Sequence, residues 1–160
     1  MKISIIYHSE SGNTKHIAEA MEDACTEFPD VEMKAFDISS VDVDFASSSK
    51  ALIFGCPTYS GSLSWQMKKY LDTCNLSLNG KLGSAFATER YIGGGADAAE
   101  LAILGCLLVR GMVIYTGGAQ EAPATHFGAV SIQNGSEEQI ERSKAFVKKI
   151  VVKAQELFGA

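Results

Sequence analysis

The sequence predicts an α/β fold: a three-layer sandwich with a five-stranded parallel sheet in the order 2-1-3-4-5 and helices on both faces. Short apolar runs, typical of buried parallel strands, alternate along the chain with longer segments of helical periodicity. Single helices between parallel strands imply right-handed crossovers that cover both faces of the sheet. A length of 160 residues with 46% hydrophobic side chains fits one domain spanning residues 1–160.

Five segments have the pattern of strands. They are residues 3–7, 31–36, 51–55, 83–87 and 112–115. Residues 31–36 alternate hydrophobic with charged side chains, which suits an edge strand with one exposed face. The other four are short apolar runs, as expected for strands inside a covered sheet.

Four segments have helical spacing of apolar residues: 12–28, 63–74, 97–110 and the last part of the chain from residue 136. In the first, Ile17, Met21, Ala24 and Phe28 repeat at steps of four, three and four. Ser136 and Gln139 form the capping-box pattern that starts a helix. Residues 39–50 are serine-rich and suit a loop or a weak helix, and residues 117–128 an irregular segment.

Composition and charge exclude some kinds of binding partner and indicate the cellular compartment. A formal net charge of -5 and a pI near 5.2 argue against nucleic acid and anionic membranes, which select basic surfaces. No apolar run approaches the ~20 residues of a membrane helix, and the N-terminal segment does not read as a signal peptide. The four cysteines lie far apart without a C-x-x-C pair, so we expect no metal site and a cytoplasmic location.

In such a sheet, ligands bind outside the carboxyl ends of the strands, where the strand order reverses. The loop after the first strand contains six consecutive small or polar residues: Ser9, Glu10, Ser11, Gly12, Asn13 and Thr14. It opens the first helix, whose backbone N–H groups suit a phosphate. The alternative is an ordinary N-cap, where serine and asparagine are favoured anyway. A Walker-type lysine is absent, which disfavours an NTPase.

This first loop resembles the phosphate loop of the flavodoxin superfamily, which has hydroxyl residues around Gly-Asn-Thr directly after strand one. The resemblance implies FMN as cofactor, because its single phosphate is held by neutral donors in that superfamily. It also implies that no side chain of the protein is catalytic, since the flavin supplies the chemistry.

The loop after the third strand, with the helix that follows it, resembles the branch of tryptophan-repressor-binding-protein-like NAD(P)H:quinone oxidoreductases. The loop residues are Pro57, Thr58, Tyr59, Ser60, Gly61 and Ser62. In that family the loop lines the isoalloxazine ring, so Gly61 is expected to lie against the ring and Tyr59 to stack on it. The alternative for Tyr59 is a surface or interface aromatic, which is the role expected for Trp65.

The loop after the fourth strand matches the same family in its glycine pair before an acidic helix start. The residues assigned to cofactor binding are Thr88, Glu89, Arg90, Tyr91, Gly93, Gly94, Gly95 and Asp97. The resemblance implies that backbone N–H groups of this loop bond the flavin pyrimidine. The alternative is a flexible glycine hinge. Arg90 either stabilises reduced flavin or is exposed to solvent.

The chain also departs from the oxidoreductase branch. Tyr59 and Ser60 replace the usual Arg-aromatic pair, and residues 74–81 form a short segment where the family has a longer one bearing an active-site aromatic. The main hypothesis is an FMN-dependent enzyme that uses NAD(P)H to reduce quinones or similar acceptors. The alternative is an electron carrier between redox proteins. A non-redox binding module has no support in the sequence, and a homo-oligomer is left open.

Overall fold

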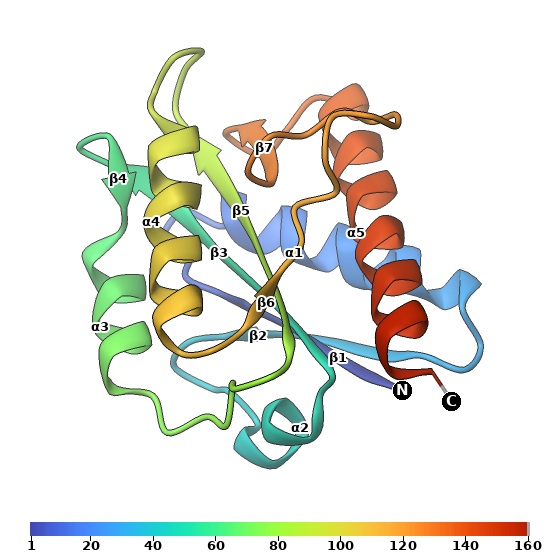
Figure 1. The fold of residues 1–160 in the computed structure, drawn as a ribbon. Coiled ribbons are helices and arrows are strands. Elements are labelled where there is room, and N and C mark those ends of the chain that lie inside the picture. The colour runs from blue at the N-terminus through green and yellow to red at the C-terminus, as the bar shows by residue number, and fades with distance from the viewer. Residues whose placement is uncertain (160) are drawn as a thin grey trace.

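The computed structural model describes residues 1–159 as a parallel sheet with helices on both faces (Figure 1). The strands are β1 (Lys2–Tyr7), β2 (Glu32–Asp37), β3 (Ala51–Tyr59), β4 (Ser62–Leu63), β5 (Leu82–Glu89), β6 (Val113–Ile114) and β7 (Ala129–Ile132). The helices are α1 (Asn13–Ala24), a 3-10 turn (Cys25–Glu27), α2 (Val43–Ser48), α3 (Trp65–Thr73), α4 (Ala96–Val109) and α5 (Glu137–Phe158).

The sheet order is β2-β1-β3-β5-β6, which confirms the predicted fold class and order. Alternate side chains of each inner strand enter two different cores, because successive residues of a strand point to opposite faces. On one face, Ile3 and Ile5 pack with residues of α1 and α5 such as Ile17 and Phe146. On the other face, Ile6 packs with residues of α3 and α4. The inner strands are therefore buried on both sides, as their apolar runs predict.

The expected count of five strands was wrong in two places. A two-residue hairpin adds β4, which pairs antiparallel with the end of β3. The last strand is split, so that β6 pairs with the start of β5 and β7 pairs with its end. Residues 115–128 leave the sheet between the two pieces, and Gly117 and Gly118 there have the positive φ angles that suit an irregular path.

The helix boundaries follow local capping chemistry. Ser136 accepts a hydrogen bond from Gln139 N–H, and the Gln139 side chain accepts one in return, so the predicted capping box is confirmed. Ser64 begins α3 by accepting from Met67 N–H. In the stretch expected to be a loop or weak helix, Asp42 begins the six-residue α2. Among residues 1–159, no helix combines the length and apolar character needed to cross a bilayer.

Candidate functional site

A cleft of about 710 Å³ lies at the carboxyl ends of the central strands β1, β3 and β5. Parallel strands bring their following loops to the same edge of the sheet, so three segments distant in sequence meet there. The lining residues are Glu10, Ser11, Asn13, Thr14, Pro57, Thr58, Tyr59, Ser60, Thr88, Glu89, Arg90 and Gln133. Eleven of these residues come from the three loops predicted to bind a ligand, and the twelfth, Gln133, follows β7.

The first loop leaves the start of α1 open. Gly12 is the N-cap residue and adopts a left-handed conformation at φ 88°, which a residue with a side chain rarely adopts. Gly12 has no side chain to cap the helix, and the first turn of this 12-residue helix contains no acidic residue. Within residues 1–159, no acceptor faces the N–H groups of Asn13, Thr14 and Lys15. Free N–H groups and the helix dipole favour an anion at this position.

Hydroxyl groups face the same region from the three loops. The buried Thr14 and Thr88 hydroxyls contact each other at 2.8 Å, joining the start of α1 to the end of β5. The Oγ of Ser9 and the Oγ1 of Thr58 are shielded from solvent and have no hydrogen-bond partner among the described residues. Buried polar atoms normally find partners, so these two hydroxyls fit a site that receives its partner from a ligand.

The second loop is a tight hairpin held against the third loop. Ser60 and Gly61 both have positive φ angles, as in the two-residue turns that suit the twist of paired strands. The backbone of Gly95 lies so close to Gly61 that a Cβ on Gly95 would be 2.9 Å from the Gly61 Cα. The two glycines therefore allow the second and third loops to pack backbone to backbone beside the cleft.

A carboxylate joins the first loop to the second. Glu10 accepts hydrogen bonds from the Tyr59 hydroxyl at 3.1 Å and from the Gln66 amide at 2.7 Å. Partial burial raises the pKa of Tyr59, and the Glu10 carboxylate raises that pKa further. Tyr59 is thus a neutral phenol whose hydroxyl is hydrogen-bonded to the first loop at the cleft wall.

The third loop satisfies the N-terminus of α4 with the chain's own carboxylate. Gly95, at φ 95°, is the N-cap and provides no side-chain cap. The Glu89 carboxylate instead accepts a hydrogen bond from Ala96 N–H at 3.1 Å, and Asp97 lies in the first turn. Negative charge therefore already occupies this helix start, in contrast to α1.

Not every residue assigned from the sequence lines the cleft. Those outside its lining are Ser9, Gly12, Gly61, Ser62, Tyr91, Gly93, Gly94, Gly95 and Asp97. Asp97 lines a separate cavity of about 230 Å³ between α4 and α5, and Tyr91 is exposed at the tip of the third loop. Gln133 was not expected from the sequence; directly after β7, its N–H donates to the Glu89 carbonyl and so brings the residue to the cleft. The short β7 had no recognisable pattern that could have identified it.

Comparison with known proteins agrees with this geometry. The family model described as flavodoxin matches residues 5–96, and the flavodoxin of Clostridium saccharobutylicum is 41% identical over 160 residues, covering 99% of this chain and 100% of its own. The chain belongs to the flavodoxin family. An NAD(P)H dehydrogenase (quinone) of Archaeoglobus fulgidus is 26% identical over 192 residues and is covered over 98% of both chains. The superfamily resemblance found in the sequence is thus confirmed, with relatives of both kinds.

Solved structures support the fold of this flavodoxin-family chain. A flavodoxin from the domain Archaea has a TM-score of 0.77 at 23% identity, covering 97% of this chain and 99% of its own. A WrbA-like flavodoxin from Agrobacterium tumefaciens has a TM-score of 0.78 at 20% identity, with 98% of both chains covered. A protein described as a flavodoxin and one described as WrbA-like therefore share this fold, which by itself does not distinguish their activities.

Family membership implies FMN, and the residues present fit that group. The open α1 terminus is suited to an anion, and the orphaned Ser9 and Thr58 hydroxyls could act as neutral donors. Among residues 1–159, Arg90 is the only lysine or arginine that lines the cleft, and it lies on the third loop rather than on the first. The first loop therefore suits one phosphate held by neutral donors.

Proposed function

We propose that the protein is an FMN-binding electron carrier that exchanges electrons with redox proteins. The residues that would hold FMN are the α1 N-terminus with Ser11 and Thr14 for the phosphate, and the loops around Tyr59 and Arg90 for the ring. The remaining residues assigned from the sequence would support these contacts. Bound flavin would accept and release electrons, which no side chain of this cleft can do. The domain is taken as residues 1–160.

The observation that favours a carrier over a hydride-accepting enzyme is the position of residues 74–81. Leu76 and Leu78 are buried in the core beneath α3 and α4, and Gly80 is hydrogen-bonded to Gly111. This segment therefore leads from the end of α3 to the start of β5, at the amino ends of the strands, whereas the cleft lies at their carboxyl ends (Figure 1). Hydride transfer needs a nicotinamide oriented about 3–3.5 Å from the flavin, which requires a wall beside the ring. Residues 74–81 are too far from the cleft to form that wall.

The relatives agree with this choice. The similarity to the Clostridium saccharobutylicum flavodoxin is greater, at 41%, than the 26% to 33% reached by the quinone dehydrogenases and the other flavodoxins among the relatives. An NAD(P)H-dependent quinone reductase is the second candidate, because several of those relatives carry that name over about 70% or more of this chain.

Anaerobic stopped-flow reduction of the FMN-loaded protein separates the two functions. A carrier is reduced rapidly by dithionite or by a protein reductase and stays oxidised with millimolar NADH or NADPH. Rapid bleaching of the flavin by either nucleotide, followed by turnover with a quinone, would replace the carrier with the enzyme. Matched titrations with FMN and riboflavin test the cofactor assignment first, since equal affinity would mean that the first loop holds no phosphate.

A further inference from the structure

A carboxylate lies inside the very loop that suits a phosphate. Glu10 stands between Ser9 and Ser11, two residues before the glycine that begins α1, and it lines the cleft. Its side chain is 62% exposed, so it has room to turn. The free N–H groups and the dipole of α1 attract any nearby anion, including a carboxylate of the chain itself. Glu10 therefore has the charge and the position to compete with a phosphate for this helix start.

Two neutral donors hold this carboxylate on the opposite side of the cleft entrance, against the second loop and α3. The Tyr59 hydroxyl donates to Glu10 Oε2 at 3.1 Å, and the Gln66 side-chain amide donates to Glu10 Oε1 at 2.7 Å. Each donor bonds a different oxygen, so the contact fixes the orientation of the carboxylate as well as its position. Both oxygens are thus engaged away from α1.

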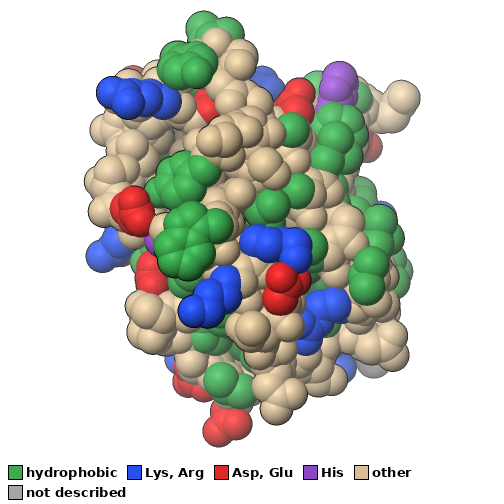
Figure 2. Space-filling model, turned by 90° about the vertical axis from the view of Figure 1, so that its left-hand side faces the viewer, with side chains coloured by type: hydrophobic (Ala, Val, Ile, Leu, Met, Phe, Trp, Pro, Cys, Tyr) green, Lys and Arg blue, Asp and Glu red, His purple; other side chains and the backbone are tan. Residues whose placement is uncertain are grey.

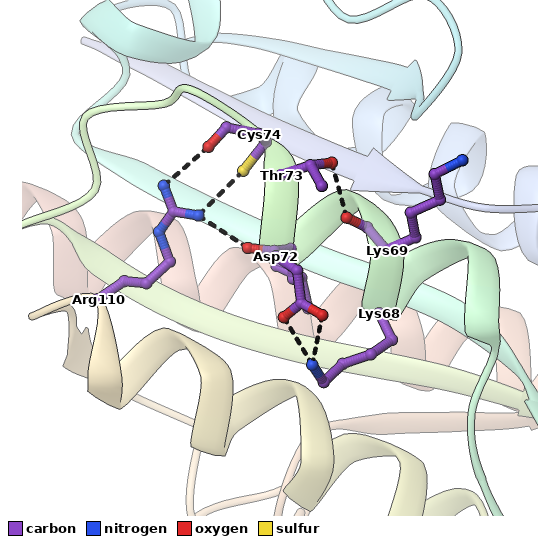
Figure 3. A network of polar contacts seen from close by, with 7 residues as sticks. Lys68, Lys69, Asp72, Thr73, Cys74 and Arg110 are labelled. Carbon is purple, nitrogen blue, oxygen red and sulfur yellow. Dashed lines mark hydrogen bonds and ion pairs between the residues drawn. The ribbon is translucent and has the colours of Figure 1, made fainter.

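The two donors belong to elements that are themselves anchored. Tyr59 is the last residue of β3, where the hairpin pairs it with β4. Gln66 lies in the first turn of α3, and after the other end of that helix Arg110 donates to backbone carbonyls (Figure 3). With both donors on anchored elements, the mobile member of the contact is the Glu10 side chain.

The contact holds Glu10 without neutralising its charge. Figure 2 shows basic and acidic side chains grouped on the face that includes α3, and Lys68 of that helix is already paired with Asp72 at 2.6 Å. Within residues 1–159, the basic side chain nearest to the Glu10 carboxylate is His8, at 4.0 Å. Burial lowers the pKa of His8 more than Glu10 raises it, so this imidazole is neutral at pH 7.5. Once released, the carboxylate would therefore keep its full attraction for N–H groups.

We propose that Tyr59 and Gln66 are positioning residues that hold Glu10 away from the N-terminus of α1 and so keep this helix start free for the cofactor phosphate. The inference rests on the FMN-binding function proposed above, and it assigns part of the selectivity for a phosphorylated flavin to a contact between the first loop, the second loop and α3. Without the contact, Glu10 occupies the phosphate position in a fraction of the molecules. The apparent dissociation constant rises as the fraction with a free site falls.

The test releases Glu10 and measures selectivity for the phosphate. The double variant Tyr59→Phe/Gln66→Leu removes both donors and keeps the aromatic ring and the side-chain bulk. Fluorescence titration at pH 7.5 gives the ratio of the riboflavin to the FMN dissociation constant. Changes in ring packing act on both ligands and cancel in this ratio, because the two differ only in the phosphate. We expect the ratio to fall about fivefold, the effect of a typical side-chain contact at a helix N-terminus.

Rescue by a neutral side chain separates competition from a change of shape. In the double variant, Glu10→Gln should return the ratio to within about twofold of the parent, because an amide carries no charge that the helix attracts. Glu10→Gln alone should also leave the ratio within about twofold. Asp30→Asn is the control for net charge: it is exposed just before β2, at the amino ends of the strands, and should restore nothing.

Amide chemical shifts of the protein without flavin give a second readout, with inorganic phosphate as the probe. In the parent, phosphate should shift the N–H resonances of Asn13, Thr14 and Lys15. In the double variant these resonances should be displaced before any phosphate is added and should respond less to it. Glu10→Gln should return them to their parental positions.

Two results would overturn the proposal. An unchanged ratio in the double variant would mean that Glu10 stays away from α1 without its donors. A fall that Glu10→Gln does not restore would mean that Tyr59 and Gln66 act by shaping the cleft. A different result would refute the proposed FMN-binding function itself: equal affinity of the parent for FMN and riboflavin, with first-turn amides that do not respond to phosphate.

Discussion

The N-termini of α1 and α4 have the same backbone geometry. Each helix follows a glycine in the left-handed conformation, Gly12 at φ 88° and Gly95 at φ 95°, and neither glycine can cap its helix with a side chain. They differ in charge: α4 has the Glu89 carboxylate on Ala96 N–H and Asp97 in its first turn, whereas the first turn of α1 has no acid. The difference teaches that a free helix start, rather than a glycine-rich loop, makes α1 the better candidate for an anion site.

The largest effect is expected when a carboxylate is placed beside the N-terminus of α1, so that this helix start becomes negatively charged like that of α4. Ser11→Asp should raise the FMN dissociation constant about 100-fold, because a charge-assisted contact of about 1.5–3 kcal/mol becomes a repulsion. Riboflavin, which has no phosphate, should bind the variant and the parent equally. Ser11→Asn is the neutral control and should cost about fivefold. Fluorescence titration measures all three, and equal behaviour of the Asp and Asn variants would remove the phosphate from this loop.

The buried Glu100 carboxyl of α4 predicts that the stability of the fold depends on pH. Glu100 is 1% exposed, and burial raises its pKa from 4.5 to about 9, with smaller contributions from Asp97 and Glu89. The folded state therefore holds a proton that the unfolded state has lost, so stability should fall as pH rises from about 4.5 to about 9.

The free energy of unfolding should fall by about 2 kcal/mol between pH 6 and pH 8. The limit for one proton is about 1.4 kcal/mol per pH unit, which is about 2.7 kcal/mol over this range. Denaturant unfolding across this range measures the slope, which Glu100→Gln should flatten whatever it does to absolute stability. Glu138→Gln, at an exposed position of α5, should keep the slope of the parent. A parental slope in the Glu100 variant would assign the pH dependence to other groups.

Removing the carboxylate from the start of α4 should make it resemble α1. Glu89→Ala loses the acceptor for Ala96 N–H and should lower the free energy of unfolding by about 1 kcal/mol. For a chain of this length that corresponds to about 3 °C in Tm. Glu89→Gln keeps an acceptor oxygen and should retain most of the stability. A thermal melt in which the Ala variant matches the parent would show that this hydrogen bond does not cap the helix.

The smallest effect concerns the orphaned hydroxyl beside α1. Ser9→Ala removes a buried group without a partner, so stability should change by less than about 0.5 kcal/mol, while FMN affinity should fall about fivefold. Ser84→Ala is the matched control, since the Ser84 hydroxyl is also buried and unpartnered but lies within β5, where it pairs with Ile53 of β3, rather than on the first loop. Calorimetric titration should separate the two variants, and equal FMN affinity would leave Ser9 without a role at the phosphate.

The order of the strands and the three loops of the cleft could be predicted from the sequence. Buried strands between single helices admit few parallel topologies. Tyr59 and Thr88 lie at the carboxyl ends of β3 and β5, and Thr14 lies just beyond the loop after β1, so these residues must meet at one end of the sheet. The start of α5 was equally clear, because Ser136 and Gln139 cap it through contacts three residues apart. These features depend on local spacing, which the sequence contains.

Tertiary structure alone decided the features that join distant segments. Gln133 enters the cleft because β7 pairs with the end of β5. The four residues of β7 have no clear alternation of apolar and polar side chains, so the sequence did not predict that pairing. Gly95 is needed beside Gly61 only because two loops more than thirty residues apart pack together. The charge at each helix start also depends on how a loop folds back: Glu89 reaches Ala96 across seven residues, while Glu10 turns to Tyr59 and leaves α1 free. Periodicity describes one segment at a time, and such contacts form only between segments.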